Sequence, residues 1–214
     1  MKNNEIKIGL DKLGLTEQNI YRNLTVNQLV NDIVANGEGV VGLKGAVMVD
    51  TGIYTGRSPK DKYIVDESSS SSDIWWGPVN QKTSEMTFNK LYKQVKNFYN
   101  SNSRTKTYVF DGFAGADPNH ALSVRIIAKK AWQAHFVHNM FIRPEENELE
   151  NFSPGFTIIN ASDFKNDNYK EYGMNSETFI VFHIKKRIAI IGGTEYGGEM
   201  KKGIFSILHY LLPK

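Results

Sequence analysis

The stretch from Ile188 to Gly203 reads IAIIGGTEYGGEMKKG, and it predicts a strand, a turn and the start of a helix. Its first four residues are apolar, as in a β-strand buried on both faces. Glycine pairs at 192–193 and 197–198 then interrupt the pattern, which is typical of a turn. Apolar side chains recur at helical spacing over 198–212, so we predict a helix there. A buried strand that leads into a helix favours an α/β fold.

Lys201 and Lys202 fall in the predicted first turn of this last helix. The positive end of the helix macrodipole lies there, so each lysine would cost up to about 1 kcal/mol if unpaired. Two lysines in such an unfavourable position indicate a nearby anion or a functional role for their amines. A glycine hinge followed by two solvent-facing lysines would give the same pattern, and the residues alone leave both interpretations open.

A second segment rich in functional groups is TGIYTGRSPKDK at 51–62. Its glycines allow tight turns, its hydroxyls are hydrogen-bond donors, and the planar guanidinium of Arg57 matches a carboxylate or a phosphate. The composition indicates a site for an anionic substrate. The alternative is a hairpin loop whose charges are only solvated.

The remaining pattern predicts more strands than helices. Helices are expected between the N-cap Thr25 and Gly37, and over 84–99 and 129–140. Strands are expected at 40–41, 46–49, 63–65, 107–110, 122–127, 156–159, 179–184 and 187–191. This order lacks the regular alternation of a doubly wound sheet. We therefore predict an α/β fold over residues 1–214, a single domain in which helices pack on a mixed β-sheet.

Composition narrows the classes of function. The formal net charge of +3 requires no nucleic-acid partner, and the chain contains no cysteine, which excludes disulfides and thiolate metal sites. We find no apolar run near the roughly 18 residues that span a bilayer, and residues 1–20 carry charges throughout. We expect a cytoplasmic protein with no membrane partner.

Three other features have simpler explanations. The serines at 68–72 predict a flexible surface loop, and Trp75 and Trp76 are expected to anchor that loop to the core. His135 and His138 are three residues apart on a predicted helix, but no matching carboxylate accompanies them. We expect core or partly buried imidazoles rather than metal ligands.

The two segments, together with the blocks between them, resemble the amino-terminal domain of ATP-dependent phosphoenolpyruvate carboxykinases. The resemblance covers nearly the whole chain. Its blocks are TGIYTGRSPKDKYIV (51–65), WWGPVN (75–80), FDGFAGADP (110–118), LSVRIIAKKAWQAHFVHNMFIRP (122–144), NSETFIVFHI (175–184) and GGTEYGGEMKKGIFSILHYLLP (192–213). The family is expected to convert oxaloacetate and ATP to phosphoenolpyruvate, ADP and carbon dioxide in gluconeogenesis, using magnesium and manganese.

The resemblance also implies the site residues. Arg57 matches the arginine that binds the oxaloacetate carboxylate, and Tyr196 matches the tyrosine that lines the substrate and carbon dioxide pocket. Lys202 matches the lysine that binds the transition metal through a neutral amine and also faces substrate. Lys201 matches a lysine near the transferring phosphoryl group. Arg57, Lys201 and Lys202 are thus the implied catalytic residues.

The sequence departs from the family pattern at its end. No G-x-x-x-x-G-K-[ST] phosphate loop occurs, and the family's other metal ligands and second substrate arginine have no counterpart. We expect the carboxyl-terminal nucleotide-binding domain to be absent from this chain. One amine cannot hold a catalytic metal, so we expect neither tight binding of ATP or metal nor catalysis by these residues alone. The alternative function is a non-catalytic small-anion binding or interaction module with the same fold.

Overall fold

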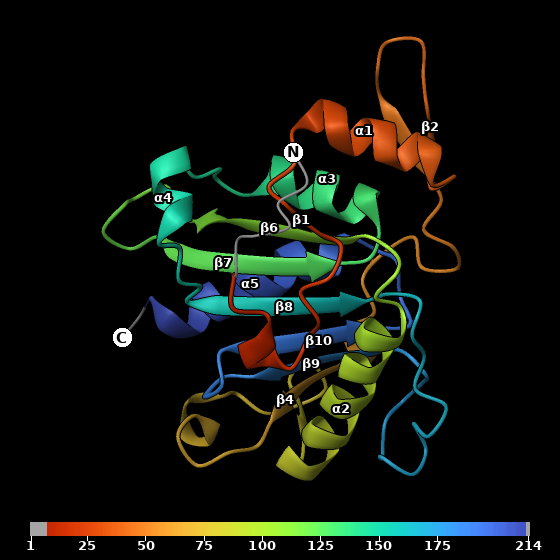
Figure 1. Ribbon diagram of the computed structural model, residues 1–214. Helices are drawn as coiled ribbons and strands as arrows, with labels where there is room; N and C mark the ends of the chain where they lie inside the picture. Colours follow the sequence, from red (N-terminus) through yellow and green to blue (C-terminus); the bar gives the residue numbers. More distant parts are fainter. Residues whose placement is uncertain (1–7, 213–214) are drawn as a thin grey trace.

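The computed structural model describes residues 8–212, and its centre is a mixed sheet of eight strands (Figure 1). The strand order is β1-β6-β7-β8-β10-β9-β4-β5. The pairs β6–β7 and β9–β10 are antiparallel, whereas the other pairs in this sheet are parallel. The predicted mixed sheet with packed helices is therefore confirmed.

The strands lie close to their predicted positions, and two of them were not predicted. They are β1 (Ile20–Arg22), β4 (Lys62–Val65), β5 (Gln81–Thr83), β6 (Thr107–Ala114), β7 (Leu122–Ala128), β8 (Phe156–Ala161), β9 (Phe179–His183) and β10 (Ile188–Gly192). The strands β1 and β5 were not predicted because each has three residues, too few to show an alternation of apolar and polar side chains.

Helices cover both faces of the sheet, with α2 (Glu85–Ser101) in front and α5 (Gly198–Leu211) behind it (Figure 1). All of β10 is buried, and its side chains alternate between the two layers. Ile188 and Ile190 belong to the cluster under α2, while Ala189 and Ile191 belong to the cluster under α5. This two-sided burial explains why the strand is uniformly apolar.

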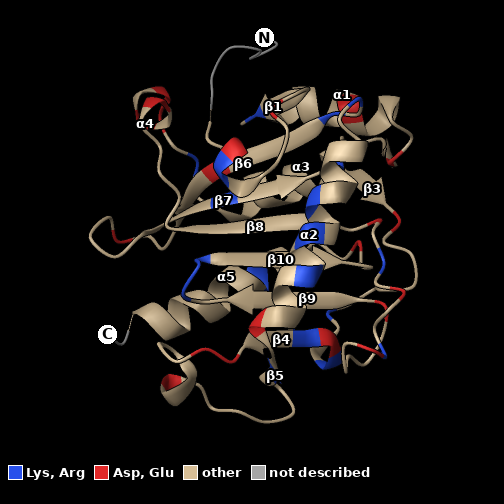
Figure 2. Ribbon diagram, turned by 60° about the horizontal axis from the view of Figure 1, so that its bottom comes forward, with Lys and Arg blue, Asp and Glu red and all other residues tan. Residues whose placement is uncertain are grey.

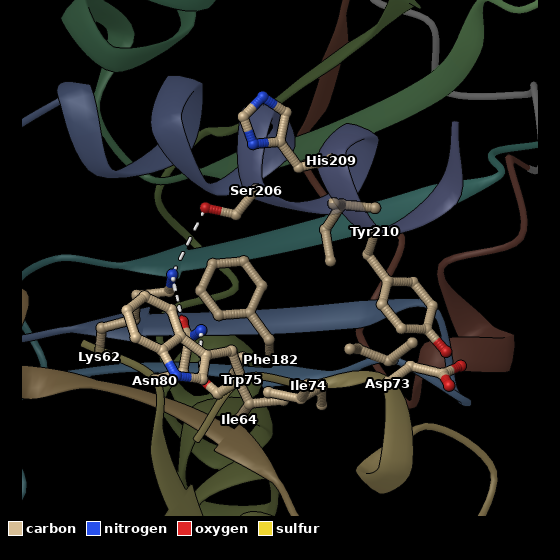
Figure 3. A pocket seen from close by; sticks show the side chains of 12 residues that line it. Lys62, Ile64, Asp73, Ile74, Trp75, Asn80, Phe182, Ser206, His209 and Tyr210 are labelled. Carbon is tan, nitrogen blue, oxygen red and sulfur yellow. Dashed lines mark hydrogen bonds between the residues drawn. The ribbon is translucent and has the colours of Figure 1, made fainter. Parts of the chain in front are cut away.

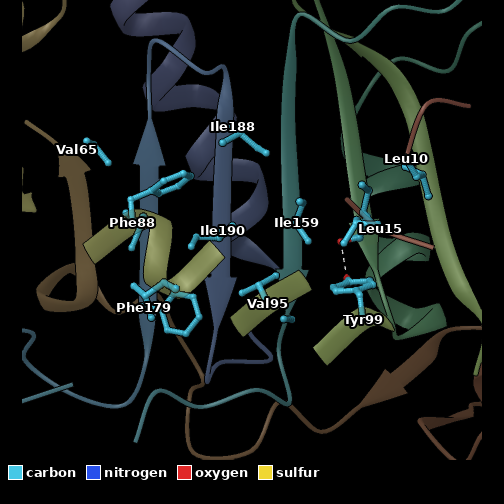
Figure 4. Packing of buried hydrophobic residues seen from close by; sticks show 14 of the residues in the cluster. Leu10, Leu15, Val65, Phe88, Val95, Tyr99, Ile159, Phe179, Ile188 and Ile190 are labelled. Atoms are coloured by element: carbon cyan, nitrogen blue, oxygen red, sulfur yellow. Dashed lines mark hydrogen bonds between the residues drawn. The ribbon is translucent and has the colours of Figure 1, made fainter. Parts of the chain in front are cut away.

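The cluster in front of the sheet joins α2 to the central strands (Figure 4). Ser84 accepts a hydrogen bond from the Thr87 backbone N–H and so caps α2. The apolar face of α2 consists of Phe88, Leu91, Val95 and Tyr99. Tyr99 also donates its buried hydroxyl to the Asn160 carbonyl at 2.6 Å, which satisfies the polar end of this side chain.

The remaining helices are α1 (Val26–Ala35), α3 (Ala131–Met140) and α4 (Glu146–Glu150). Thr25 caps α1 as predicted, through a capping box with Gln28. Leu29 and Ile33 of α1 pack in one cluster with Trp132 of α3. None of the helices among residues 8–212 is long and apolar enough to cross a membrane.

The strands β2 (Gly39–Val41) and β3 (Val47–Val49) pair only with each other, in a separate antiparallel sheet. They lie beside α1 at the top of Figure 1. The loop at 51–62 is therefore not the loop of a hairpin, which was the alternative interpretation of its sequence. It leads from this small hairpin into β4 of the main sheet.

The serine segment is more structured than a flexible surface loop. Ser70 is buried, and a 3-10 helix, η3, spans Ser71–Asp73. Trp76 donates its indole N–H to the Ser71 carbonyl at 2.9 Å and packs against the rear cluster, so it anchors the loop as expected. For Trp75 the expectation is wrong, because its side chain is 88% exposed.

A buried ion cluster fixes the β1 edge of the sheet. The Asp111 carboxylate receives Nε and a terminal nitrogen from both Arg22 and Arg125, at 2.7–2.8 Å. Arg125 also donates Nη1 to the Ile8 carbonyl at 2.5 Å, and Arg22 donates Nη1 to the Leu149 carbonyl at 3.0 Å. Two cations and one anion are thus buried together, and each forms several hydrogen bonds.

His183 gives the fold a predictable response to acid. Its ring is buried beside Phe88, and burial is the main cause that lowers its pKa below 6.5. The unfolded chain then binds the proton more readily than the folded chain. Stability from neutral His183 is therefore present above about pH 6.5 and is lost as the pH falls through the lower folded-state pKa.

We predict that His183→Gln makes the free energy of unfolding less dependent on pH between 7.5 and 5, because this variant cannot take up the proton. Urea unfolding at several pH values measures the effect. His120→Gln is the control, since His120 is exposed beside Asp117. An equal loss of stability on acidification in His183→Gln and the unmodified chain would contradict the assignment.

Candidate functional site

The sheet register brings the two candidate segments to the same end of the sheet. Gly192 at the end of β10 pairs with Phe179 at the start of β9, and Ile180 pairs with Lys62 at the start of β4. The turn after β10 and the loop before β4 are therefore neighbours, although more than a hundred residues separate them in sequence.

Thr178, just before β9, holds both segments. Its Oγ1 lies 2.8 Å from the Tyr54 hydroxyl and donates a hydrogen bond to the Gly193 carbonyl at 3.0 Å. Gly193 has φ +73°, and a Cβ there would lie 2.8 Å from the Thr178 hydroxyl oxygen. Only glycine fits this turn without strain.

Asp61 fixes the other end of the loop. Its buried carboxylate accepts hydrogen bonds from the Asn175 side-chain amide at 2.9 Å and the Ser176 hydroxyl at 2.8 Å. It also accepts the hydroxyl of Ser58, the residue that follows Arg57. The loop is thus held at Tyr54, Ser58 and Asp61, which leaves the exposed Arg57 side chain on a supported backbone.

Glu199 links the two segments directly. Its side chain belongs to the first turn of α5, and its Oε1 accepts the Ser58 backbone N–H at 2.6 Å. The residue is only 7% exposed. Burial raises the Glu199 pKa, whereas the Ser58 N–H and the nearby Arg57 charge act in the opposite direction. One buried carboxylate therefore joins the arginine loop to the lysine helix.

The four predicted site residues belong to the two segments that this hydrogen bond joins. Tyr196 is half-buried in the turn before α5, where its ring leaves no room for a Cβ on Gly198. Lys201 and Lys202 lie exposed on α5, and the Lys202 ammonium is 4.7 Å from the centre of the Phe205 ring. The structure thus brings Arg57, the two lysines and Tyr196 to one end of the sheet.

The predicted placement of the lysines in the first helical turn is wrong. Because α5 begins at Gly198, Lys201 and Lys202 are its fourth and fifth residues, one turn further along. The residue in the first turn is Glu199, whose negative charge the macrodipole stabilises. The helix start therefore favours this acid instead of opposing the two lysines.

Lys62 is a further cation at this end of the sheet that the sequence analysis did not assign. Its Nζ donates to Asn80 Oδ1 at 3.2 Å and Ser206 Oγ at 3.4 Å. Burial and the neighbouring Arg57 lower its pKa, and Glu199 partly offsets them. In the sequence, Lys62 is only the third cation of RSPKDK (57–62). Its packing under α5 could not be predicted from there, because it depends on contacts with residues distant in sequence.

The described residues do not form a metal centre. Between residues 8 and 212, no group of three His, Asp or Glu side chains is arranged to hold a metal ion. Lys202 would contribute a single amine donor from an exposed position beside Phe205, and one amine does not hold a metal ion. A transition metal therefore does not fit the donor set that residues 8–212 supply by themselves.

His135 and His138 of α3 and the lysines of α2 do not belong to the candidate site. His135 and His138 are half-buried on α3, as expected, and burial lowers both pKa values. Figure 2 shows lysines along the outer face of α2. Of these, Lys90 lies 3.7 Å from Glu171, in an exposed ion pair that agrees with a solvated face.

Comparison with known proteins gives one consistent result. The model of the family described as "Phosphoenolpyruvate carboxykinase" matches residues 18–214. The chain is 55% identical to the phosphoenolpyruvate carboxykinase (ATP) of Leptospira biflexa, over 96% of the chain and 38% of that protein. It is 47% identical to the enzyme of the same name from Sulfurimonas denitrificans (97% and 38%), and 49% identical to that from Bacillus cytotoxicus (98% and 39%). The chain thus spans less than two fifths of these relatives.

The hydrogen bond between Glu199 and the Ser58 backbone predicts how substitutions at Glu199 change the stability of the fold. Glu199→Ala leaves the Ser58 N–H without its acceptor, so we expect a loss of about 1–3 kcal/mol in the free energy of unfolding. Glu199→Gln keeps an acceptor oxygen and should recover most of that loss. Chemical denaturation measures the stability, and amide hydrogen exchange at Ser58 reports on the hydrogen bond itself.

The matched control is Glu195→Ala, four residues earlier. Glu195 forms a partly exposed ion pair with Lys130 at 3.1 Å, and its removal should cost under about 1 kcal/mol. Unchanged protection of the Ser58 amide in Glu199→Ala would show that this hydrogen bond does not hold the loop.

Proposed function

Because the chain belongs to the ATP-dependent phosphoenolpyruvate carboxykinase family, we propose that it is the substrate-side part of a longer enzyme. That enzyme would convert oxaloacetate and ATP to phosphoenolpyruvate, ADP and carbon dioxide, in the direction of gluconeogenesis. Residues 1–214 would form its amino-terminal domain and supply the oxaloacetate and carbon dioxide site. The carboxyl-terminal nucleotide-binding domain would be its partner.

The chemistry requires a fixed cation at the substrate carboxylate. The bond between C3 and C4 of oxaloacetate breaks, C4 leaves as carbon dioxide, and the electron pair forms the enolate of pyruvate. The enolate oxygen then takes the γ-phosphoryl group of ATP. Arg57 would bind a substrate carboxylate with two N–H donors and keep the substrate in place while its charge moves.

The other three residues would surround the same substrate. The Tyr196 hydroxyl and ring edge would orient the departing carbon dioxide. Lys201 would stabilise negative charge near the enolate and the transferring phosphoryl group. Lys202 would contribute one amine to the manganese site of the complete enzyme, whose remaining ligands, together with the sites for magnesium and ATP, would lie in the carboxyl-terminal part.

The single observation that carries this proposal is the hydrogen bond between Glu199 and Ser58. It joins the Arg57 loop to the helix of Lys201 and Lys202, and the family match extends over both segments. A module that only binds small anions would need the arginine loop but not the two lysines, so their combination favours the enzyme. The anion-binding module remains the alternative that the following experiments test.

We predict no turnover by this chain alone, because its residues complete neither a nucleotide site nor a metal site. The assay measures release of carbon dioxide from oxaloacetate in the presence of ATP and manganese. A rate near the roughly 10 per second that is typical of enzymes would contradict the division of the site between two parts of a longer chain.

We also predict that Arg57 dominates the binding of oxalate, a dicarboxylate that resembles the enolate. Loss of a charged hydrogen-bonding partner corresponds to a roughly 10- to 100-fold weaker affinity, so Arg57→Ala should weaken oxalate binding by that factor. Isothermal titration calorimetry gives the affinity, and Lys60→Ala is the control for an exposed cation in the same loop. Equal oxalate binding by Arg57→Ala would refute the assignment of Arg57.

A further inference from the structure

A cavity of about 280 Å³ lies beside the candidate site, between α5 and the segment that links β4 to β5 (Figure 3). One end of the cavity is polar, and the floor of the cavity is apolar. Its lining consists of Lys62, Ile64, Asp73, Ile74, Trp75, Asn80, Phe182, Ile184, Ser206, Ile207, His209 and Tyr210. None of the four predicted site residues is among them.

The polar end of the cavity is formed by Lys62. Its ammonium has two neutral acceptors, Asn80 Oδ1 and Ser206 Oγ, at the long distances of 3.2 and 3.4 Å. In the described part of the chain, Lys62 takes part in no ion pair. A half-buried cation with weak neutral partners can still gain a strong charge-assisted hydrogen bond from an anion in the cavity.

The Asn80 amide is already oriented for this arrangement. Its Nδ2 donates to the Trp75 carbonyl at 3.0 Å, so its Oδ1 is the atom that faces Lys62. Lys62 also lies 5.9 Å from the centre of the Phe182 ring. The ammonium is therefore held at the boundary between the polar end and the apolar floor.

The floor and the far end restrict the ligand further. Phe182, Ile64 and Ile207 are buried beneath the cavity, and the exposed Trp75 forms one wall. Asp73 and Tyr210 lie at the end away from Lys62 (Figure 3). A ligand with a second negative charge would meet the Asp73 carboxylate, which disfavours dicarboxylates.

We propose that this cavity binds a small monocarboxylate with an aromatic or branched apolar body. The carboxylate would pair with Lys62, and the apolar body would cover Phe182 and Trp75. Lys62 is the one lysine or arginine in the lining, so a dianionic phosphate would keep an uncompensated charge there unless His209 were protonated. The volume lies just below the usual range of roughly 300–1,000 Å³ for ligand pockets, which limits the ligand to a small molecule.

Phenylacetate is a suitable probe, and phenylacetamide is its neutral counterpart of nearly the same shape. Titration of this chain, followed by the NMR signal of the Trp75 indole N–H, should show saturable binding of phenylacetate and at least about tenfold weaker binding of phenylacetamide. The signal is assigned with Trp75→Phe. Equal affinity for the two compounds, or no shift at Trp75, overturns the proposal.

Substitutions at Lys62 test whether its positive charge binds the carboxylate of phenylacetate. Lys62→Met should weaken phenylacetate binding by about tenfold or more, while Lys62→Arg keeps the charge and should retain binding. Lys60→Met is the matched control, because Lys60 is exposed two residues away. If Lys62→Met is folded by its NMR spectrum and binds phenylacetate normally, the proposal is wrong.

The same experiment separates this site from the proposed oxaloacetate site. Arg57→Ala should lose oxalate binding and keep phenylacetate binding, since Arg57 does not line the cavity. Loss of phenylacetate binding in Arg57→Ala would show that the probe occupies the Arg57 site, and the separate cavity site would then be refuted.

Discussion

The structure depends on the complete burial of β10 between two helical layers. Both faces of this strand are covered, which favours its uniformly apolar side chains, and its neighbours β8 and β9 are equally buried. A strand held this firmly can lead into a turn that only glycine fits, without losing its register. Gly192 and Gly193 form that turn, and the polar chemistry of the molecule begins directly after it.

The site shows how a buried charge can organise a surface. Arg57, Lys201 and Lys202 are exposed and would each be mobile on an unsupported backbone. The buried Glu199 and Asp61 carboxylates hold the backbone of the Arg57 loop through hydrogen bonds to Ser58. Such acids are costly to bury, and the surrounding cations and N–H donors offset that cost. The backbone position of the candidate residue Arg57 is thus set by two acids that are not themselves among the predicted site residues.

Most of the architecture could be predicted from local patterns, since β10 is a continuous apolar run and α2 and α5 show a helical hydrophobic period. The assignment of Arg57, Tyr196, Lys201 and Lys202 came from resemblance, because composition alone left a solvated loop and a glycine hinge open. Glu199 and Lys62 were missed for a different reason. Their importance arises from contacts with Ser58 and Ser206, at separations of 141 and 144 residues, and no local pattern records such contacts. The exposed Trp75 was misjudged because an aromatic pair does not reveal which ring turns inward.

The ion cluster of Arg22, Asp111 and Arg125 limits how the amino-terminal segment can be shortened. Arg125 is satisfied partly by the Ile8 carbonyl, so the backbone before the first strand acts as a ligand of a buried guanidinium. A polypeptide trimmed to begin after residue 10 would keep every strand and helix and would still leave a desolvated donor without its acceptor. The Ile8 carbonyl, which precedes both the 3-10 helix Asp11–Leu13 and β1, is therefore part of the folded structure as a hydrogen-bond acceptor for a buried guanidinium.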